Sequence, residues 1–236
     1  RMRSSEALPT KLITDSRIIL SRTGKWYICL QIEKPSDSRD AGVSTTTTPR
    51  ITSIDPEVRT FLTGYEPNTG GFWESGSGDI NRIQRICDHM DNLRGRMNMK
   101  RTKHRRRYRI KRAVRRMEMR IRNLIDEVHK KTCKWLTETF DVIVLPKFNV
   151  SNMVARKHNK GHKRKLGRKT ARQMLNWGHY RFRQRLWYKS IETNTHVVVC
   201  DEVYTSKTCG RCGWSKPRKV SFTGKIFKCK MCDLVI

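Results

Sequence analysis

The sequence predicts an α/β fold, in which a mixed sheet is interrupted by a pair of long helices and followed by a small cysteine-rich module. Three observations predict it. Short β-branched segments bounded by turn residues occupy 51–79, and a helical apolar period then runs to about residue 140. Two further apolar strands follow at 141–150 and 195–204, and two C-x2-C pairs lie beyond them.

The charge of the chain indicates a polyanionic partner. The 236 residues include 52 Lys and Arg against 21 Asp and Glu, a formal net charge of +31. Such an excess repels itself in a compact fold unless a polyanion offsets it. Nucleic acid is the first candidate and anionic membrane the second. We expect no membrane partner, because no apolar run approaches the roughly 18 residues of a membrane span.

The amino-terminal third is predicted to be built of strands. Residues 17–33 form a hairpin that turns at Gly24, and the Ser-, Thr- and Pro-containing segment 34–50 is a linker, with a domain boundary near residue 48. The segments 51–55, 58–66 and 70–79 then form a three-stranded antiparallel meander.

The segment 79–140 is predicted to be two helices folded against each other, with a turn within 96–103. Between Lys100 and Arg122, 13 of 23 residues are Lys or Arg, and only Glu118 offers an acidic partner four positions away. This pattern fits either a solvated face or a helix that faces phosphates, and we favour the second. The predicted contacts, including those from the basic loop at 155–173, are Arg105, Arg106, Arg107, Arg112, Arg116, Lys163, Arg164, Lys165 and Arg168.

The rest of the core is predicted as a strand at 141–150, one helix at 172–194 and a strand at 195–204, with both strands buried. Together with the meander and the helix pair, this order indicates a sheet of the RNase H type. The aromatic residues Trp177, Tyr180 and Trp187 are expected in the core rather than stacked on bases. The histidines are expected to be solvated or to contact phosphate: His158, His162 and His179.

The strongest motif is the cysteine cluster, Cys209, Cys212, Cys229 and Cys232. Two C-x2-C pairs separated by 16 residues direct four thiolates to one point, which predicts one structural zinc ion in a closed tetrahedral site. Two disulfides or an iron site are the alternatives. The remaining cysteines are expected to be small buried apolar residues: Cys29, Cys87, Cys133 and Cys200.

Acidic residues at strand ends are the candidates for catalysis. Asp55 ends the first strand of the meander, where it either forms a local Asx turn ahead of Pro56 or binds a cation. Glu202 ends the last strand, and its neighbour Asp201 is predicted to face the other way. Asp141 opens its strand and therefore lies at the wrong end. Asp55 and Glu202 are thus the predicted pair, with a third acid still missing.

These motifs resemble the RuvC-like nucleases of the TnpB and Fanzor family. The segment "SIDPEVRTFLTGYEP" resembles the first nuclease motif and "DVIVLPKFNV" the second. The segment "DEVYTSKTCGRCG…FKCKMCDLVI" resembles the zinc ribbon that leads to the third, and the hairpin at 17–33 resembles the end of the family's wedge β-barrel. The implied domains are the end of the barrel and linker (1–48), the RuvC-like nuclease domain (49–204) and the zinc ribbon (205–236).

The resemblance implies an RNA-guided DNA endonuclease. Asp55 and Glu202 are then ligands of two catalytic Mg²⁺ ions, and the partners are a guide RNA (omega RNA) and target DNA, in a monomeric ribonucleoprotein. Nuclear localisation in a eukaryotic or viral host is expected, partly from the basic run "HKRKLGRK".

The departures from the family pattern leave alternatives open. Bacterial members carry a Glu where this chain has Pro146, so a displaced acid is needed, and Glu192 competes with Glu202 for that role. We expect the third motif's Asp to lie beyond Ile236, in a longer parent protein. The alternatives are a catalytically inactive transposon accessory protein that binds nucleic acid, or a ribosome-associated zinc protein.

Overall fold

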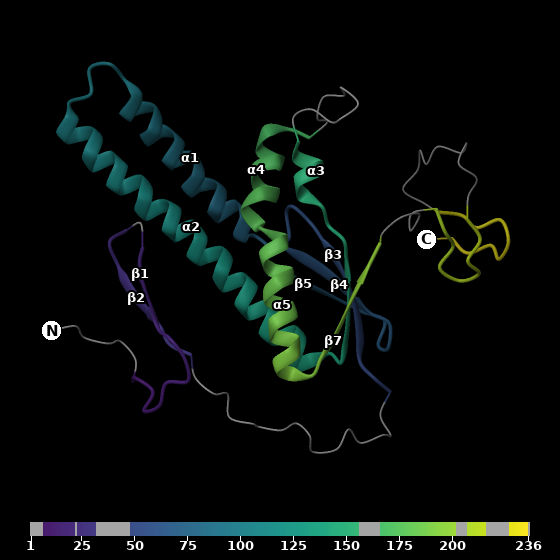
Figure 1. The fold of residues 1–236 in the computed structure, drawn as a ribbon. Coiled ribbons are helices and arrows are strands. Elements are labelled where there is room, and N and C mark those ends of the chain that lie inside the picture. Colours follow the sequence, from purple (N-terminus) through teal and green to yellow (C-terminus); the bar gives the residue numbers. More distant parts are fainter. Residues whose placement is uncertain are drawn as a thin grey trace.

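The computed structural model describes residues 7–21, 23–31, 48–155, 166–201, 207–215 and 227–235. Within them the chain forms seven strands and five helices (Figure 1). The strands are β1 (Arg17–Leu20), β2 (Trp26–Cys29), β3 (Ile51–Pro56), β4 (Leu62–Glu66), β5 (Gly71–Ser75), β6 (Val142–Pro146) and β7 (His196–Cys200). The helices are α1 (Asp79–Asn98), α2 (His104–Thr139), α3 (Val150–Val154), α4 (Arg168–Trp177) and α5 (His179–Thr193).

The central sheet has five strands in the order β5-β4-β3-β6-β7. The meander β3-β4-β5 is antiparallel, whereas β6 and β7 run parallel to β3. The parallel strands need long connections, which the helices supply. This arrangement confirms the predicted RNase H-like mixed sheet with a helical hairpin insertion.

One face of the sheet packs against α2 and α5, which lie together on the same side of the strands (Figure 1). Thr52 and Ile54 of β3 point to this face and are buried, as are Ile143 and Leu145 of β6. Side chains alternate along a strand, so the residues between them point to the opposite face. There Phe72 is 76% exposed and Val198 48% exposed, which leaves an open surface on that side of the described sheet.

The helical hairpin forms as predicted. Residues 99–103 make the turn between α1 and α2, and the expected apolar seam of α2 packs on α1, with Ile110, Val114 and Ile121 buried. At 1.5 Å per residue the 36 residues of α2 span about 54 Å, so its amino-terminal half extends well beyond the sheet.

The prediction of one continuous helix at 172–194 is wrong, because the chain forms two helices there. Gly178 adopts φ 60°, ends α4 and begins α5, so the chain turns sharply where the sequence pattern suggested continuity. Glycine reaches this left-handed conformation without the steric cost of a Cβ atom. The break places Trp177 and Phe182 on the same core, with 0% and 1% exposure. The short helix α3 was also not predicted.

Two burial predictions are wrong. Strand β7 was expected to be buried, but it lies at the edge of the sheet and most of its side chains are exposed. Cys29 was expected to be a buried apolar residue, but it lies in the exposed hairpin β1-β2, whose turn at Gly24 is as predicted. Cys87 and Cys133 are buried, as expected, and Cys200 is partly buried.

A close approach between strands explains Gly64 of β4. It pairs with Trp73 of β5, and the indole lies across the Cα atom, so that an added Cβ would come within 2.1 Å of the ring. The indole also donates a hydrogen bond of 2.9 Å to the hydroxyl of Thr52 and packs edge-on against Trp135 of α2. Because Gly64 has no side chain, Trp73 can cross β4 and contact both β3 and α2.

Candidate functional site

The four predicted metal-binding cysteines lie together. Their Sγ atoms are all within 4.8 Å of one another, and the Sγ atoms are 3.5 Å apart both for Cys209 with Cys232 and for Cys212 with Cys229. A disulfide requires about 2.05 Å, so the thiols are free and the disulfide alternative is wrong for this structure. A tetrahedral zinc site with Zn–S bonds of about 2.3 Å has S···S edges of about 3.8 Å, so these residues fit one metal ion.

The cluster is built from two similar turns, which we call the two knuckles (207–215 and 227–235). In each, the amide of the first cysteine donates a hydrogen bond to the carbonyl five residues later, Cys209 to Trp214 at 2.7 Å and Cys229 to Leu234 at 2.8 Å. A residue with positive φ follows the second cysteine, Gly213 at 71° in one knuckle and Asp233 at 52° in the other.

The knuckles also supply donors to sulfur. The amide of Met231 lies 3.3 Å from Sγ of Cys229, and the backbone amide of Cys212 contributes most to lowering the pKa of Cys209, to about 6. Donors to sulfur favour the thiolate, which is the form that binds a metal. All four positions of a tetrahedral ion would be protein ligands, which leaves no open position for chemistry and is typical of a structural metal site.

Asp55 is an exposed side chain near the carboxyl end of β3. It is paired across the strands with Thr63 of β4, and no described residue forms a hydrogen bond or ion pair with its carboxylate. The alternative of a local Asx turn is therefore wrong, since the strand continues through Pro56. Partial desolvation raises the pKa of Asp55.

The strand register defines what lies beside Asp55. Ser53 pairs with Val144 of β6, and Pro146 of β6 pairs with Cys200 of β7. Residues paired in a parallel ladder point to the same face and Ser53 is two positions before Asp55, so Asp55, Pro146 and Cys200 share the open face at the carboxyl edge of the sheet. Pro146 has no ligand atom on its side chain, and Glu202 lies outside the described residues.

The other strand-end acids have partners. Asp201 forms an ion pair of 3.1 Å with Lys147. Asp141 lies at the opposite edge, as predicted, where its carboxylate accepts a hydrogen bond of 2.8 Å from the amide of Arg50. Of these three acids, Asp55 is the one whose carboxylate has no partner among the described residues.

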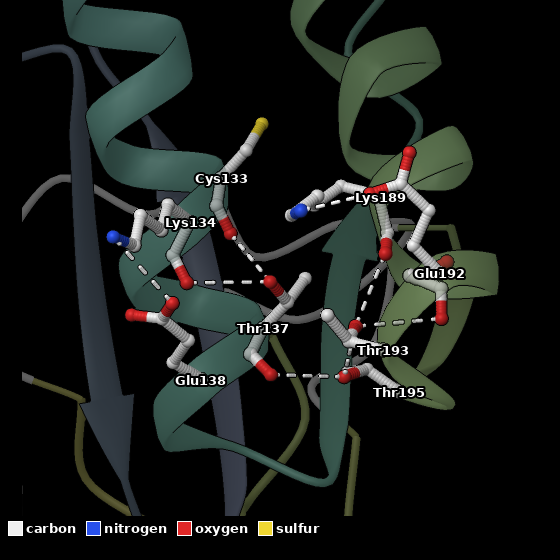
Figure 2. A network of polar contacts seen from close by, with 9 residues as sticks. Cys133, Lys134, Thr137, Glu138, Lys189, Glu192, Thr193 and Thr195 are labelled. Atoms are coloured by element: carbon white, nitrogen blue, oxygen red, sulfur yellow. Dashed lines mark hydrogen bonds and ion pairs between the residues drawn. The ribbon is translucent and has the colours of Figure 1, made fainter. Parts of the chain in front are cut away.

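Glu192 lies at the far edge of the sheet from Asp55. It pairs with Lys189 at 2.8 Å in the last turn of α5, next to Thr193 and Thr195 (Figure 2). Thr195 in turn donates a hydrogen bond of 3.2 Å to the carbonyl of Thr137, which fixes this corner at the amino end of β7. Asp55 lies four residues along the strands from this edge, roughly 13 Å away.

One acid on the open face was missed by the sequence reasoning. Thr63 pairs with both Asp55 and Glu74, so Glu74 of β5 points to the same face, two strands and roughly 10 Å from Asp55. The signal was the alternation in "GFWES", which places Trp73 inward and Glu74 outward.

The α2 arginine set (Arg105, Arg106, Arg107, Arg112 and Arg116) is exposed. No described carboxylate forms an ion pair with any of them, because the one acid in this part of α2, Glu118, pairs with Arg94 of α1 at 2.5 Å. Arg168, at the start of α4, is exposed as well. Lys163, Arg164 and Lys165 lie outside the described residues. Unpaired guanidinium groups on an extended helix suit phosphate contacts.

The prediction for His179 is wrong, because this residue is only 6% exposed in the core. Its ring stacks on Phe61 with centroids 5.1 Å apart, and His129 stacks near the same Phe61 ring at 4.9 Å. Burial lowers the pKa of both histidines to about 4, so both are neutral at physiological pH. His158 and His162 lie outside the described residues.

Of the three aromatic residues of α4 and α5 that were predicted to lie in the core, one is buried and two are exposed. Trp177 is fully buried, as expected, but Tyr180 and Trp187 are 62% and 50% exposed. The break at Gly178 rotates the second helix relative to the first, which removes these two side chains from the core.

Among the described helices, none is long and apolar enough to cross a membrane.

Comparisons with known proteins find similar sequences in large viruses. Residues 179–236 match the family model of the Cas12f1-like TNB domain. TnpB-like protein L79 of Acanthamoeba polyphaga mimivirus is 32% identical over 191 residues, which cover 77% of this chain and 34% of that protein. Putative transposase A625R of Paramecium bursaria Chlorella virus 1 is 30% identical over 176 residues, which cover 72% of this chain and 37% of that protein. The chain thus spans about a third of the length of these relatives.

Solved structures give weaker matches. A cryo-EM structure of a CRISPR-Cas12f ternary complex aligns with a TM-score of 0.49 and 16% identity, over 94% of this chain and 42% of that one. A Cas12f1-sgRNA-target DNA complex aligns with a TM-score of 0.48 and 15% identity, over 93% of this chain and 52% of that one.

Proposed function

This chain is a relative of the TnpB-like proteins, and we propose that it supplies the nuclease part of a transposon-associated, RNA-guided DNA endonuclease. The proposed reaction is hydrolysis of DNA phosphodiester bonds at the carboxyl edge of the central sheet. The observation that carries the proposal is Asp55, an exposed carboxylate at that edge without a partner among the described residues, whereas Asp141 and Asp201 are paired.

Glu202 is the proposed second acid. It follows Cys200, the last residue of β7, by two positions in the sequence. Cys200 lies on the face of Asp55, level with Pro146. We propose that Glu202, the next Glu along the chain after Cys200, supplies the carboxylate that Pro146 lacks. The pairing of Glu192 at the opposite edge supports Glu202 over Glu192.

Asp55 and Glu202 would hold Mg²⁺, since carboxylates are the hard oxygen ligands that this ion prefers. Two such ions, when bound, supply an activated water and charge stabilisation for the leaving oxygen. The chain's own contribution is the rigid sheet that fixes Asp55, with Thr63 paired beside it. The cysteine cluster would hold one zinc ion, which supports the fold of the two knuckles without taking part in the reaction.

The partners we propose are a guide RNA and target DNA in a monomeric ribonucleoprotein. The α2 arginine set would contact the phosphate backbone, since base pairing between guide and target leaves the protein to recognise the duplex by its shape and charge. A nuclear location remains a prediction.

The proposal is tested in the complete protein reconstituted with its guide RNA. The variants Asp55→Asn and Glu202→Gln should each lose DNA cleavage in Mg²⁺ and keep RNA affinity within about twofold, because each removes the charge of one proposed metal ligand. Cleavage is measured on a guide-matched, end-labelled DNA, and RNA affinity by filter binding.

The matched controls change other acids. Asp201→Asn removes the partner of Lys147, and Glu192→Gln removes the partner of Lys189, and both should still cleave. If Glu192→Gln abolishes cleavage while Glu202→Gln keeps it, the assignment of the second acid is wrong. If Asp55→Asn cleaves like the wild type, the site itself is wrong.

The second candidate is an inactive nucleic-acid-binding accessory protein. Pro146 favours it, because this position is level with Cys200 on the face of Asp55 and offers no carboxylate. In that case the wild-type protein binds the RNA but shows no Mg²⁺-dependent cleavage of matched DNA.

A further inference from the structure

A pocket of about 440 Å³ lies at the same end of the sheet as Asp55, on the other face. It is bounded by the carboxyl ends of β3 and β6 and by α3, α4 and α5. Pro56, the residue after Asp55, lines it together with Leu62, Leu145 and Phe182. Its volume is within the range of pockets that hold small organic groups, about 300–1,000 Å³.

The walls of the pocket are apolar and aromatic. Phe148 lies on one side, edge-on to the ring of His179 with centroids 4.9 Å apart, and Met174 and Leu175 of α4 lie on another. Planar groups gain by stacking and packing on such walls. The pocket therefore suits a flat guest of moderate size.

One polar group in the wall lacks a partner. Nε2 of His179 is buried and has no hydrogen-bond partner among the described residues. This nitrogen is sealed from solvent, so the ring of His179 is part of the pocket wall and its Nε2 is not a contact for a guest.

The rim of the pocket is basic and aromatic. Arg183 lies over the ring of Tyr180, 5.3 Å from its centroid, and no described carboxylate forms an ion pair with it. Lys147 also lines the pocket, but its ammonium group is paired with Asp201. Arg183 is thus the rim cation available for an anionic group attached to the guest.

We propose that this pocket binds one unpaired nucleobase of a bound nucleic acid strand, with the attached phosphate near Arg183. The proposal rests on the proposed function only in that the chain binds nucleic acid. An apolar guest would leave Arg183 without an anion, whereas a nucleotide offers a flat base for the apolar walls and a phosphate for Arg183. Taking a base out of the stack here would hold the strand next to the end of β3, where Asp55 lies.

Two Trp variants test whether the base binds in the pocket or elsewhere on the surface. Leu175→Trp places a large side chain at the pocket from an exposed position of α4. Ile191→Trp is the matched control, because Ile191 is 68% exposed on α5 and does not line the pocket. Circular dichroism checks that both variants keep the fold.

The measurement compares two 12-mers with equal phosphates, oligo-dC and an oligomer of abasic residues, without divalent metal added to the buffer. The wild type and Ile191→Trp should bind oligo-dC roughly tenfold more tightly than the abasic oligomer, and Leu175→Trp should lose most of this ratio. With 5-iodouracil in the strand, photocrosslinks in the wild type should map to 148–151 or 174–183.

The outcomes are distinct for the two proposals. Equal ratios in Leu175→Trp and Ile191→Trp, or crosslinks confined to α2, overturn the pocket proposal and leave the proposed function intact. Failure of the wild type to bind either oligomer overturns both. Loss of cleavage in Asp55→Asn with an unchanged dC-to-abasic ratio supports both.

Discussion

Lowering the pH from 7.5 to 5 is expected to destabilise the core by several kcal/mol, through His129 and His179. The two rings lie on either side of Phe61, with 0% and 6% exposure. Nε2 of His129 bonds to the carbonyl of Trp177 at 2.8 Å, but burial outweighs this contact and lowers the pKa of His129 to about 4, with further lowering by Arg185. Burial also lowers the pKa of His179 to about 4, and His129 adds to this effect.

The sign of the effect follows from linkage. The ordinary pKa of 6.5 applies to the unfolded chain, so between pH 6.5 and 4 the unfolded chain binds more protons than the folded one. The stabilising contribution of the neutral rings is complete above pH 6.5 and is lost as the pH falls toward 4. For each ring the loss between pH 7.5 and 5 is about 2 kcal/mol, and it grows to roughly 3 kcal/mol below pH 4.

The assay is urea unfolding of zinc-saturated protein at half-unit steps from pH 7.5 to 5. His179→Phe keeps an aromatic ring against Phe61 and Phe148 but removes one titrating group, so its pH dependence should be about half that of the wild type. His89→Asn, at an exposed position on α1, should leave the pH dependence unchanged. If His179→Phe shows the same pH dependence as the wild type, the core histidines do not control acid stability.

Three further changes test other parts of the molecule. Cys209→Ser should lose bound zinc, measured by elemental analysis, and remove hydrogen-exchange protection from the two knuckles while leaving the sheet protected; full protection without metal would contradict the closed zinc site. Gly64→Ala should destabilise the protein by about 1–3 kcal/mol in chemical denaturation, because a Cβ there meets Trp73 at 2.1 Å, whereas Gly95→Ala, with open space in a helix, should stabilise by up to about 1 kcal/mol. Changing the α2 arginine set to glutamine should make the slope of log binding constant against log salt concentration for duplex binding shallower by roughly 0.9 per lost phosphate contact. The same change at Lys131 and Lys134, which are paired with acids in α2, should have little effect on this slope. Equal effects of the two sets of changes would place the interface elsewhere.

Local patterns made much of the fold predictable. The period of apolar residues located both long helices and the turn between them, because helix contacts repeat every three or four residues. The spacing of Cys209 to Cys232 was sufficient to predict the metal cluster, since each knuckle is closed by hydrogen bonds within a few residues. The succession of element types was sufficient to predict a mixed sheet of the RNase H type, since parallel strands need long connections.

The errors came from tertiary burial. The histidine at position 179 lies among basic residues in the sequence, but Gly178 turns the chain so that the ring enters the aromatic core. Apolar composition alone suggested that β7 is buried, yet its edge position leaves Val198 exposed. Neither outcome is visible in a single strand or helix, because each depends on where a neighbouring element ends.

The candidate site shows that strand register, more than composition, determines which strand-end acid is available to bind a metal ion. Asp141, Asp201 and Asp55 are all acids at ends of neighbouring strands, and of these three only Asp55 has a carboxylate without a cation or an amide donor among the described residues. Pairing a strand-end acid with Lys147 stabilises the fold and neutralises the charge that a metal ion would need. An unpaired acid on a rigid strand costs little while it is exposed, and it is retained at full charge for a ligand from solvent. If the reasoning is correct, charge removal at Asp55 leaves stability within about 0.5 kcal/mol of the wild type, the range of surface changes, and its effect falls on function alone.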